Sequence, residues 1–179
     1  MGVVKILRLI DKARKGNDKA FIKLFQQYEA DIFRTAFMYV KNQNDALDVV
    51  QETAYRSFKS IGNLNEPKYF KTWLIKIAIS CALDMLRKQK KVVQMKPSVM
   101  ELISEDVKED IDLEVTLQEL IELLDDDEKS VIVLRFYHDM TIKEVAGCLD
   151  IPLGTAKTIL YRTLKRLRKE LKGDDVYGQ

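Results

Sequence analysis

The sequence contains few of the residues that make turns, disulfides and catalytic sites: 7 Gly, 3 Pro, 2 Cys and 1 His among 179 residues. Such low glycine and proline contents exclude a turn-rich β fold and favour long helices. No stretch approaches the roughly 18 apolar residues of a membrane-spanning helix. The opening segment lacks the apolar run and cleavage site of a signal peptide, so we expect a cytoplasmic protein without membrane insertion.

The two cysteines and the histidine do not form a reactive constellation. Cys81 and Cys148 lie within apolar helical patterns without metal-ligand spacing. Buried free thiols are therefore favoured over a disulfide or a metal site. His138 has no Cys–His or Ser–His pattern around it, and the chain has no glycine-rich phosphate loop. We predict that the protein is not an enzyme and needs neither a metal nor another cofactor.

Charge is unevenly distributed along the chain, although the net charge is only +2. The segment from Glu101 to Glu128 holds thirteen acidic residues and one basic residue, Lys108. Residues 71–91 and residues 152–172 are basic. This polarity predicts two cationic surfaces separated by an anionic segment.

Hydrophobic periodicity predicts an all-α protein with two small helical domains. Three helices, over about 17–40, 44–61 and 67–91, form the first domain, residues 1–92. Residues 93–112 are predicted to be an acidic flexible linker because their helical pattern is weak. Residues 113–179 form the second domain. The buried stripes expected for the second and third helices are Leu47, Val50, Ala54, Phe58 and Ile61, and Phe70, Trp73, Leu74, Ile77, Cys81 and Met85.

The segment TIKEVAGCLDIPLGTAKTILYRTLKRLRK is typical of a helix-turn-helix. Thr141 and Glu144 have the spacing of a capping box, in which each side chain bonds a free amide at the helix start. Asp150 falls at the turn, where a left-handed residue is usual. Pro152 suits the first turn of the second helix, because its missing N–H would have no intrahelical partner.

The second of these helices has an apolar side and a cationic side. The helix-turn-helix pattern favours a major-groove reader over a merely solvated cationic helix. Membrane-surface binding fits poorly, because the apolar side lacks Trp and Phe. Residues near the N-terminus of a recognition helix reach base edges, and later cations neutralise phosphates. The expected DNA contacts are Thr155, Lys157, Thr158, Ile159, Tyr161, Arg162, Lys165, Arg166 and Lys169.

Two longer segments carry a family resemblance. DALDVVQETAYRSF, followed by PKYFKTWLIKIAISCALDMLRKQKK, resembles conserved region 2 of bacterial RNA polymerase sigma factors. LLDDDEKSVIVLRFYHDMTIKEVAGCLDIPLGTAKTILYRTLKRLRKEL resembles their region 4. Two matches in this order, joined by a short linker without a region 3 domain, resemble the extracytoplasmic-function (ECF, group IV) sigma family across residues 17–172.

The resemblance implies a transcription initiation factor that directs core RNA polymerase to −35/−10 promoters. Its implied partners are promoter DNA, the β′ clamp helices and β flap of the polymerase, and an anti-sigma factor, often membrane-bound. The helix over 45–59 would dock on the clamp helices through a polar face opposite its apolar stripe. The residues of that face are Asp45, Asp48, Gln51, Glu52 and Arg56. The acidic linker would enter cationic polymerase channels, or would be a spacer without such a role.

The resemblance also implies that the third helix and the loop before it recognise and open the −10 element. Phe70 and Trp73 lie on the apolar stripe, so we expect core packing rather than base stacking. The matching polar residues are Asn63, Asn65, Lys68, Lys71, Lys76, Ser80, Arg87 and Lys88.

The chain departs from the family pattern at several positions. Ser80 stands where the family often has Asn, which puts a −10 contact there in doubt. Ile159 replaces a frequent Arg and could pack on a thymine methyl, but it cannot form a bidentate guanine contact. Asp84 falls near the apolar face, where Arg87 or Lys88 could neutralise its charge.

Two other functions remain open at this point. A stand-alone helix-turn-helix regulator would bind operator DNA as a dimer, but the polar 45–52 face suits neither a ligand pocket nor a dimer seam. A helical adaptor that contacts no DNA would not need the dense basic face over residues 157–172.

Overall fold

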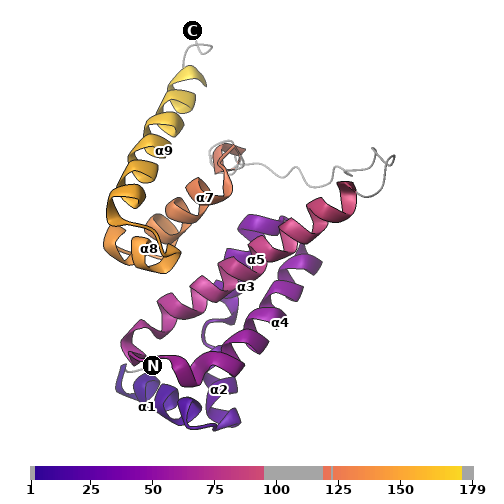
Figure 1. Ribbon diagram of the computed structural model, residues 1–179, viewed down its shortest axis with the longest axis vertical. Helices are drawn as coiled ribbons and strands as arrows, with labels where there is room; N and C mark the ends of the chain where they lie inside the picture. The colour runs from indigo at the N-terminus through magenta and orange to yellow at the C-terminus, as the bar shows by residue number, and fades with distance from the viewer. Residues whose placement is uncertain (1–2, 95–118, 122, 175–179) are drawn as a thin grey trace. The chain divides into compact units, whose positions relative to one another are not determined.

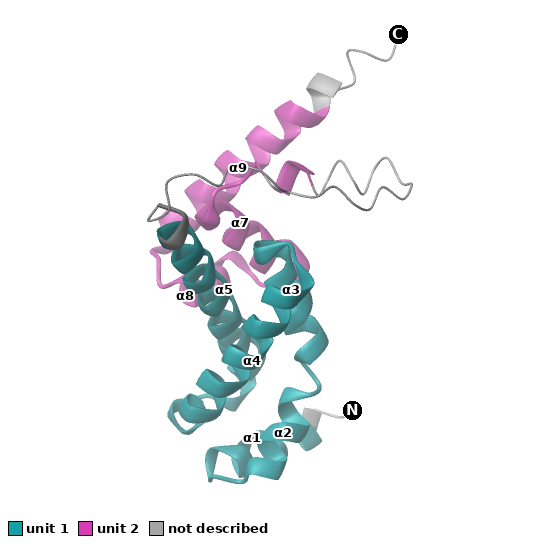
Figure 2. Ribbon diagram, turned by 90° about the vertical axis from the view of Figure 1, so that its right-hand side faces the viewer, with its two compact units in different colours: residues 1–97 teal, residues 98–179 magenta. Residues whose placement is uncertain are grey.

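The computed structural model describes residues 3–94, 119–121 and 123–174 (Figure 1). All regular elements in these ranges are helical, which confirms the predicted fold class. The chain divides into two compact units, residues 1–97 and 98–179 (Figure 2). Residues 95–112 of the predicted linker lie outside the described part of the chain.

Unit 1 is a helical bundle built from short and long helices. Its elements are α1 (Val3–Arg14), α2 (Asp18–Phe25), α3 (Glu29–Val40), α4 (Gln43–Ser60), the 3₁₀ turns η1 (Ile61–Asn63) and η2 (Pro67–Tyr69), and α5 (Phe70–Gln94). The prediction of three helices for this region was wrong. It missed α1, and it merged α2 and α3, because the intervening turn at residues 26–28 contains neither glycine nor proline.

Capping residues set the helix boundaries in unit 1. Gly16 adopts φ +84° after α1, a left-handed conformation that glycine reaches without a Cβ clash. Asn17 then caps α2, its side-chain oxygen accepting a hydrogen bond from the Ala20 amide at 2.8 Å. Asn42 caps α4 in the same way through the Asp45 amide. The predicted helix start at residues 16–18 is confirmed.

The buried face of α4 differs from the predicted stripe. Val50 and Ile61 are buried as expected, but Leu47 and Phe58 are each 44% exposed. The buried positions are instead small: Ala46, Val49, Thr53 and Ser57. The Thr53 and Ser57 hydroxyls donate to the carbonyls of Val49 and Thr53 at 2.7 and 2.6 Å. Because these bonds satisfy the hydroxyls within the helix, polar residues can occupy the core face.

Helix α5 packs against both α3 and α4, so its buried face is wider than one stripe. Phe70, Leu74 and Cys81 are buried as predicted. Trp73, also assigned to the core, is only half-buried, and its ring centroid lies 5.7 Å from that of Phe70. The wider face adds the buried residues Ile75, Ala78, Ile79 and Ala82.

Unit 2 contains a helix-turn-helix preceded by another helix. Its elements are α7 (Asp126–Ile132), the π-helical turn η3 (Val133–Tyr137), α8 (Ile142–Leu149) and α9 (Leu153–Asp174). The Thr141–Glu144 capping box is present, and Asp150 adopts φ 53° at the turn. Both predictions are confirmed. Pro152 lies just before α9 and accepts the Ala156 amide hydrogen bond through its carbonyl.

Candidate nucleic-acid and polymerase interfaces

The apolar side of α9 packs within unit 2, and this packing determines which side chains face solvent. Ala156, Leu160 and Thr163 are buried, and α9 contacts both α7 and α8. The opposite side exposes the polar residues near the start of the helix. Tyr161 and the Arg162 side chain are 66% and 61% exposed. A helix held this way presents its cationic face outward, as a groove-binding helix requires.

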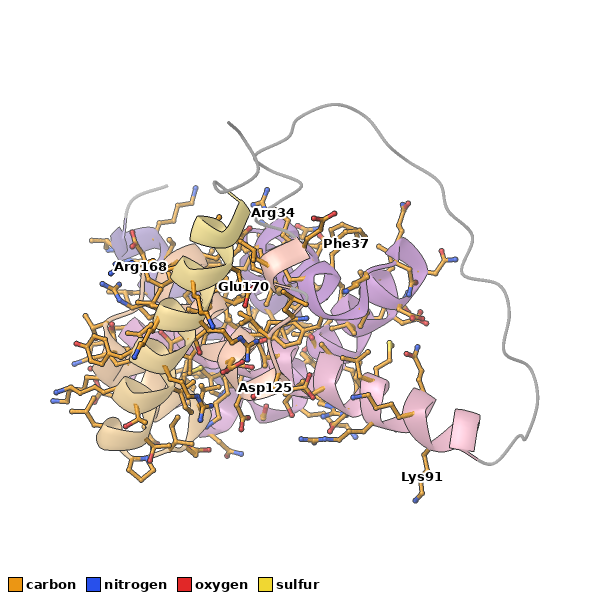
Figure 3. All side chains as sticks on the ribbon, turned by 90° about the horizontal axis from the view of Figure 1, so that it is seen from above. Arg34, Phe37, Lys91, Asp125, Arg168 and Glu170 are labelled. Atoms are coloured by element: carbon orange, nitrogen blue, oxygen red, sulfur yellow. The ribbon has the colours of Figure 1, made fainter. Side chains whose placement is uncertain are left out.

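The remaining predicted contacts on α9 are exposed to different degrees. Thr155, Lys157, Thr158, Lys165 and Lys169 are exposed, whereas Ile159 is half-buried. The Thr158 hydroxyl donates to the Gly154 carbonyl at 2.9 Å, so one of its hydrogen-bonding groups serves its own helix. Arg168 and Glu170 lie further along the same helix (Figure 3).

A buried carboxylate beneath α9 was not anticipated from the sequence. Glu128, in the first turn of α7, is 2% exposed. Its Oε2 lies 2.9 Å from Arg166 Nη1, and its Oε1 lies 3.5 Å from Arg162 Nε. Arg166 also donates to the Leu123 carbonyl. Arg166, predicted to contact a phosphate, is thus bound within unit 2. The sequence signal for a structured Glu128 was the D-x-x-E capping pattern of residues 125–128.

The loop from η1 to η2 is anchored by apolar side chains and exposes its amides. Ile61 and Leu64 are 4% and 6% exposed, whereas Asn63 and Asn65 face solvent. Lys68 lies 3.6 Å from Glu66, with its ammonium 4.9 Å from the centroid of the Tyr69 ring. Tyr69 is 46% exposed, and sequence analysis overlooked it as an aromatic surface for a base.

The cations predicted on α5 do not share one face. Lys76, Ser80 and Arg87 follow helical spacing along one side, and the latter two are exposed. Lys71 is rotated about 140° from Lys76 at 100° per residue, and its ammonium lies 3.9 Å from Asp31 of α3. Lys88 is exposed on a third side of the helix.

The polar face predicted on α4 is divided by contacts with α5. Asp45 accepts a hydrogen bond from Gln89 at 2.8 Å. Arg56 pairs with Glu52 at 2.6 Å and with Asp84 of α5 at 2.8 Å. These hydrogen bonds, first to Asp84 and then to Glu52, raise the pKa of Arg56 above its usual value.

The predicted Arg87–Asp84 pair is present, and this network adds a closer partner for Asp84. Arg87 lies farther from the Asp84 carboxylate, at 3.5 Å, than Arg56, at 2.8 Å. The sequence predicted Arg56 on the polymerase-binding face of α4. It could not show that Arg56 also pairs with Asp84, because the spacing within α4 gives no information about α5. Asp48 and Gln51 remain exposed on that face.

Unit 1 also exposes apolar surface between α3 and α4. A groove of about 410 Å³ lies there. Its lining residues are Gln26, Glu29, Ala30, Phe33, Arg34, Leu47 and Val50. Phe37, 37% exposed, lies one turn beyond Phe33, with its ring centroid 6.2 Å away, and Figure 3 shows it close to Arg34 on α3. The exposure of Leu47 in its lining makes this groove a candidate protein-binding surface.

Neither a metal site nor a membrane span emerges from the described residues. They contain no group of three His, Cys, Asp or Glu side chains that could hold a metal ion. Cys81 and Cys148 are buried free thiols, as predicted, and burial raises the pKa of the Cys81 thiol. None of the described helices is long and apolar enough to cross a membrane.

The helix-turn-helix with its exposed basic helix is the arrangement of a DNA-binding protein. Residues 24–92 match the model of sigma-70 region 2, and residues 120–169 match that of sigma-70 region 4. The chain belongs to the ECF sigma-70 family, whose members direct RNA polymerase to promoters and are not enzymes.

Individual relatives support this assignment over most of the chain. The RNA polymerase sigma factor SigV of Bacillus subtilis (strain 168) is 36% identical over 165 residues, covering 92% of this chain and 99% of SigV. The ECF RNA polymerase sigma factor SigW of the same strain is 28% identical, covering 93% and 97%.

A solved structure shows the same fold. It is the sigma factor RpoE in complex with the anti-sigma factor NepR from Bartonella quintana, with a TM-score of 0.70 at 20% identity. The match covers 86% of this chain and 98% of that one.

Proposed function

We propose that the two units divide promoter recognition between them, with α9 reading the −35 element as duplex DNA. The observation that carries this proposal is the exposure of Tyr161 and Arg162 above a buried apolar side. Lys157, Thr158 and Ile159 border the same surface near the helix start and complete the base-reading group. Lys165 and Lys169 follow along the helix, where their charge suits phosphates.

Unit 1 contacts the −10 element through the η1–η2 loop and α5. Asn63 and Asn65 face solvent on an anchored loop, where an amide can hydrogen-bond a base edge. Tyr69 and Lys68 offer a ring and a cation to separated strand. Lys76, Ser80 and Arg87 extend this polar surface along one side of α5, so a single strand could follow the helix from the loop.

Core polymerase docks on the polar face of α4, where Asp48 and Gln51 are exposed. Asp45, Glu52 and Arg56 contribute to that face while being held by contacts within α4 and with α5. An anionic, hydrogen-bonding surface suits the cationic β′ clamp helices that the family resemblance implies. The β flap is the corresponding partner of unit 2.

Run-off transcription with core polymerase, this protein and candidate promoters tests the proposal. The protein should convert core polymerase into an enzyme that initiates at a defined start site. A stand-alone operator-binding regulator is the competing function. If core plus protein initiates nowhere while the protein alone binds duplex DNA tightly and specifically, the competing function is correct.

An anti-sigma factor is proposed as a regulatory partner that covers the groove between α3 and α4. The lining of the groove combines apolar residues with Arg34 and Glu29, which suits an amphipathic segment. The solved structure of a sigma factor bound to an anti-sigma factor shares this fold and supports an anti-sigma factor as the kind of partner.

When the protein is purified from its own cells, an anti-sigma factor should co-purify with it and inhibit run-off transcription. Leu47→Asp should weaken binding of the anti-sigma factor and restore initiation. If the anti-sigma factor inhibits wild type and the variant equally, its contact lies outside this groove.

A further inference from the structure

The geometry of unit 2 points to Glu128 as a residue that positions Arg162 for reading a base of the −35 element. This inference rests on the proposed function of α9 and adds a specificity-determining residue outside the recognition helix. Glu128 belongs to α7 and would not touch DNA. It acts through the guanidinium of Arg162, which is the group that reaches the groove.

Glu128 is held in place from its own helix. It is the third residue of α7, and its amide donates to the Asp125 side chain at 2.8 Å. Its carboxylate lies near the Asp125 amide in return, at 3.4 Å. A carboxylate at a helix N-terminus is stabilised by the free amides and the helix dipole. Contacts within α7 alone therefore orient the Glu128 side chain, independently of the arginines of α9.

The two arginines contact this carboxylate unequally. Arg166 bonds Oε2 at 2.9 Å and also donates to the Leu123 carbonyl, so it neutralises the buried charge and fastens α9 to the start of α7. Arg162 lies 3.5 Å from Oε1, beyond the usual 2.7–3.2 Å of an N–H···O hydrogen bond. Arg162 is thus oriented by the charge without being bound by a short hydrogen bond.

The atom that Arg162 presents to Glu128 matters for recognition. The ion pair runs through Nε, which leaves the two terminal nitrogens for a ligand. Those nitrogens form the fork that binds O6 and N7 of a guanine. With the Arg162 side chain 61% exposed, the carboxylate restricts the rotamers of an otherwise mobile group. Less side-chain entropy is then lost when the base is bound.

The test compares Glu128→Gln with Asp127→Asn in the full-length protein. Both changes remove one negative charge from the first turn of α7, but Asp127 is exposed. Initiation is measured by run-off transcription with core polymerase on promoters carrying every single-base change in the −35 element. Arg162→Ala identifies the base that Arg162 reads, because that variant stops discriminating at one position.

Glu128→Gln should reduce discrimination at that same base position by about tenfold, with the other positions unchanged. Asp127→Asn should leave the whole profile as in wild type. The double variant Glu128→Gln/Arg162→Ala should be no worse than Arg162→Ala alone, because the two residues act as one unit. If Glu128→Gln does not fold, Glu128→Asp retains the charge but withdraws it from Arg162, and it should give the same selective loss.

A Glu128 variant that discriminates like wild type, or that loses activity evenly at every position, would overturn the inference. Even loss would mean that Glu128 serves only the stability of unit 2. These results are distinct from failure of the proposed function, in which the wild-type protein itself would show no −35 preference.

Discussion

In unit 2 the groups assigned to DNA project from one side of a single helix, α9, whereas in unit 1 the groups assigned to ligands come from α4, α5 and the loop between them. The buried Ala156, Leu160 and Thr163 fix which side of α9 faces outward. In unit 1, contacts between helices decide which polar groups stay available: Arg56 holds Asp84, and Asp45 holds Gln89. A helical wheel is therefore informative for α9 and misleading for α4.

The largest effect is expected when the outward face of α9 loses its best base-reading group. Arg162→Ala should lower −35-dependent initiation roughly 10- to 100-fold, the equivalent of about 1–3 kcal/mol for a lost bidentate base contact. Its affinity for core polymerase, measured by competition binding, should stay as in wild type. Arg168→Ala removes the same charge further along α9 and serves as the control. If Arg162→Ala lost affinity for core polymerase as strongly as it lost −35-dependent initiation, the assignment of Arg162 to base reading would be wrong.

The next effect concerns the α4–α5 network. Arg56→Ala should lower the free energy of unfolding by about 1–2 kcal/mol, because Asp84 loses its nearest partner while remaining partly accessible to water. Arg87→Ala is the matched control, since its guanidinium lies farther away and its side chain is 72% exposed. Chemical denaturation of both variants measures the difference. If the two variants were equally stable, the network would not hold α4 to α5.

A moderate effect is expected on polymerase docking. Asp48→Lys should weaken core binding several-fold and increase its sensitivity to salt, because it reverses a charge on the exposed part of the α4 face. Asp11→Lys makes the same change at an exposed position of α1 and serves as the control. Binding of labelled protein to core polymerase measures both variants. Similar affinities for the two would move the docking surface away from α4.

A smaller effect is expected at Ile159. Ile159→Arg should shift base preference at one −35 position from thymine toward guanine, since an arginine can form the bidentate contact that isoleucine cannot. Initiation on the set of single-base −35 promoters measures the shift. An unchanged preference would show that this half-buried position does not reach the groove.

The smallest effect is a pH dependence of the α8 cap. Hydrogen bonds from the Thr141 side chain and amide lower the pKa of Glu144. Because the folded-state pKa is below the unfolded one, the stabilisation is complete above the unfolded value and is lost as pH falls through the folded value. Wild type and Glu144→Gln, compared by thermal unfolding between pH 7 and pH 3, should converge at the acidic end.

The sequence predicted the features that depend on local spacing. The Thr141–Glu144 cap, the left-handed Asp150, the buried cysteines and the apolar side of α9 all follow from neighbours along one helix. The contacts that it missed join residues distant in the chain. Glu128 lies 34 residues before Arg162, and Arg56 lies 28 residues before Asp84, separations at which helical periodicity carries no information.

The α4 stripe failed for a different reason. Leu47 and Phe58 have the expected spacing and hydrophobicity, but the helix buries Thr53 and Ser57 instead. Internal hydrogen bonds make these small polar residues suitable for a close helix contact. The exposed Leu47 instead lines the groove between α3 and α4, although its hydrophobicity pattern assigns it to the core.

The division of labour between the units is tested most directly by run-off transcription with two variants on two altered promoters. Arg162→Ala and Asn63→Ala are each assayed on promoters with a scrambled −35 or a scrambled −10 element. Arg162→Ala should respond less to the −35 change than wild type does, because it has lost one −35 base contact, and it should keep its full response to the −10 change. Asn63→Ala should respond less to the −10 change than wild type does and should keep its full response to the −35 change. Variants that both lose activity in the same proportion on both promoters would contradict a separate reading of the two elements.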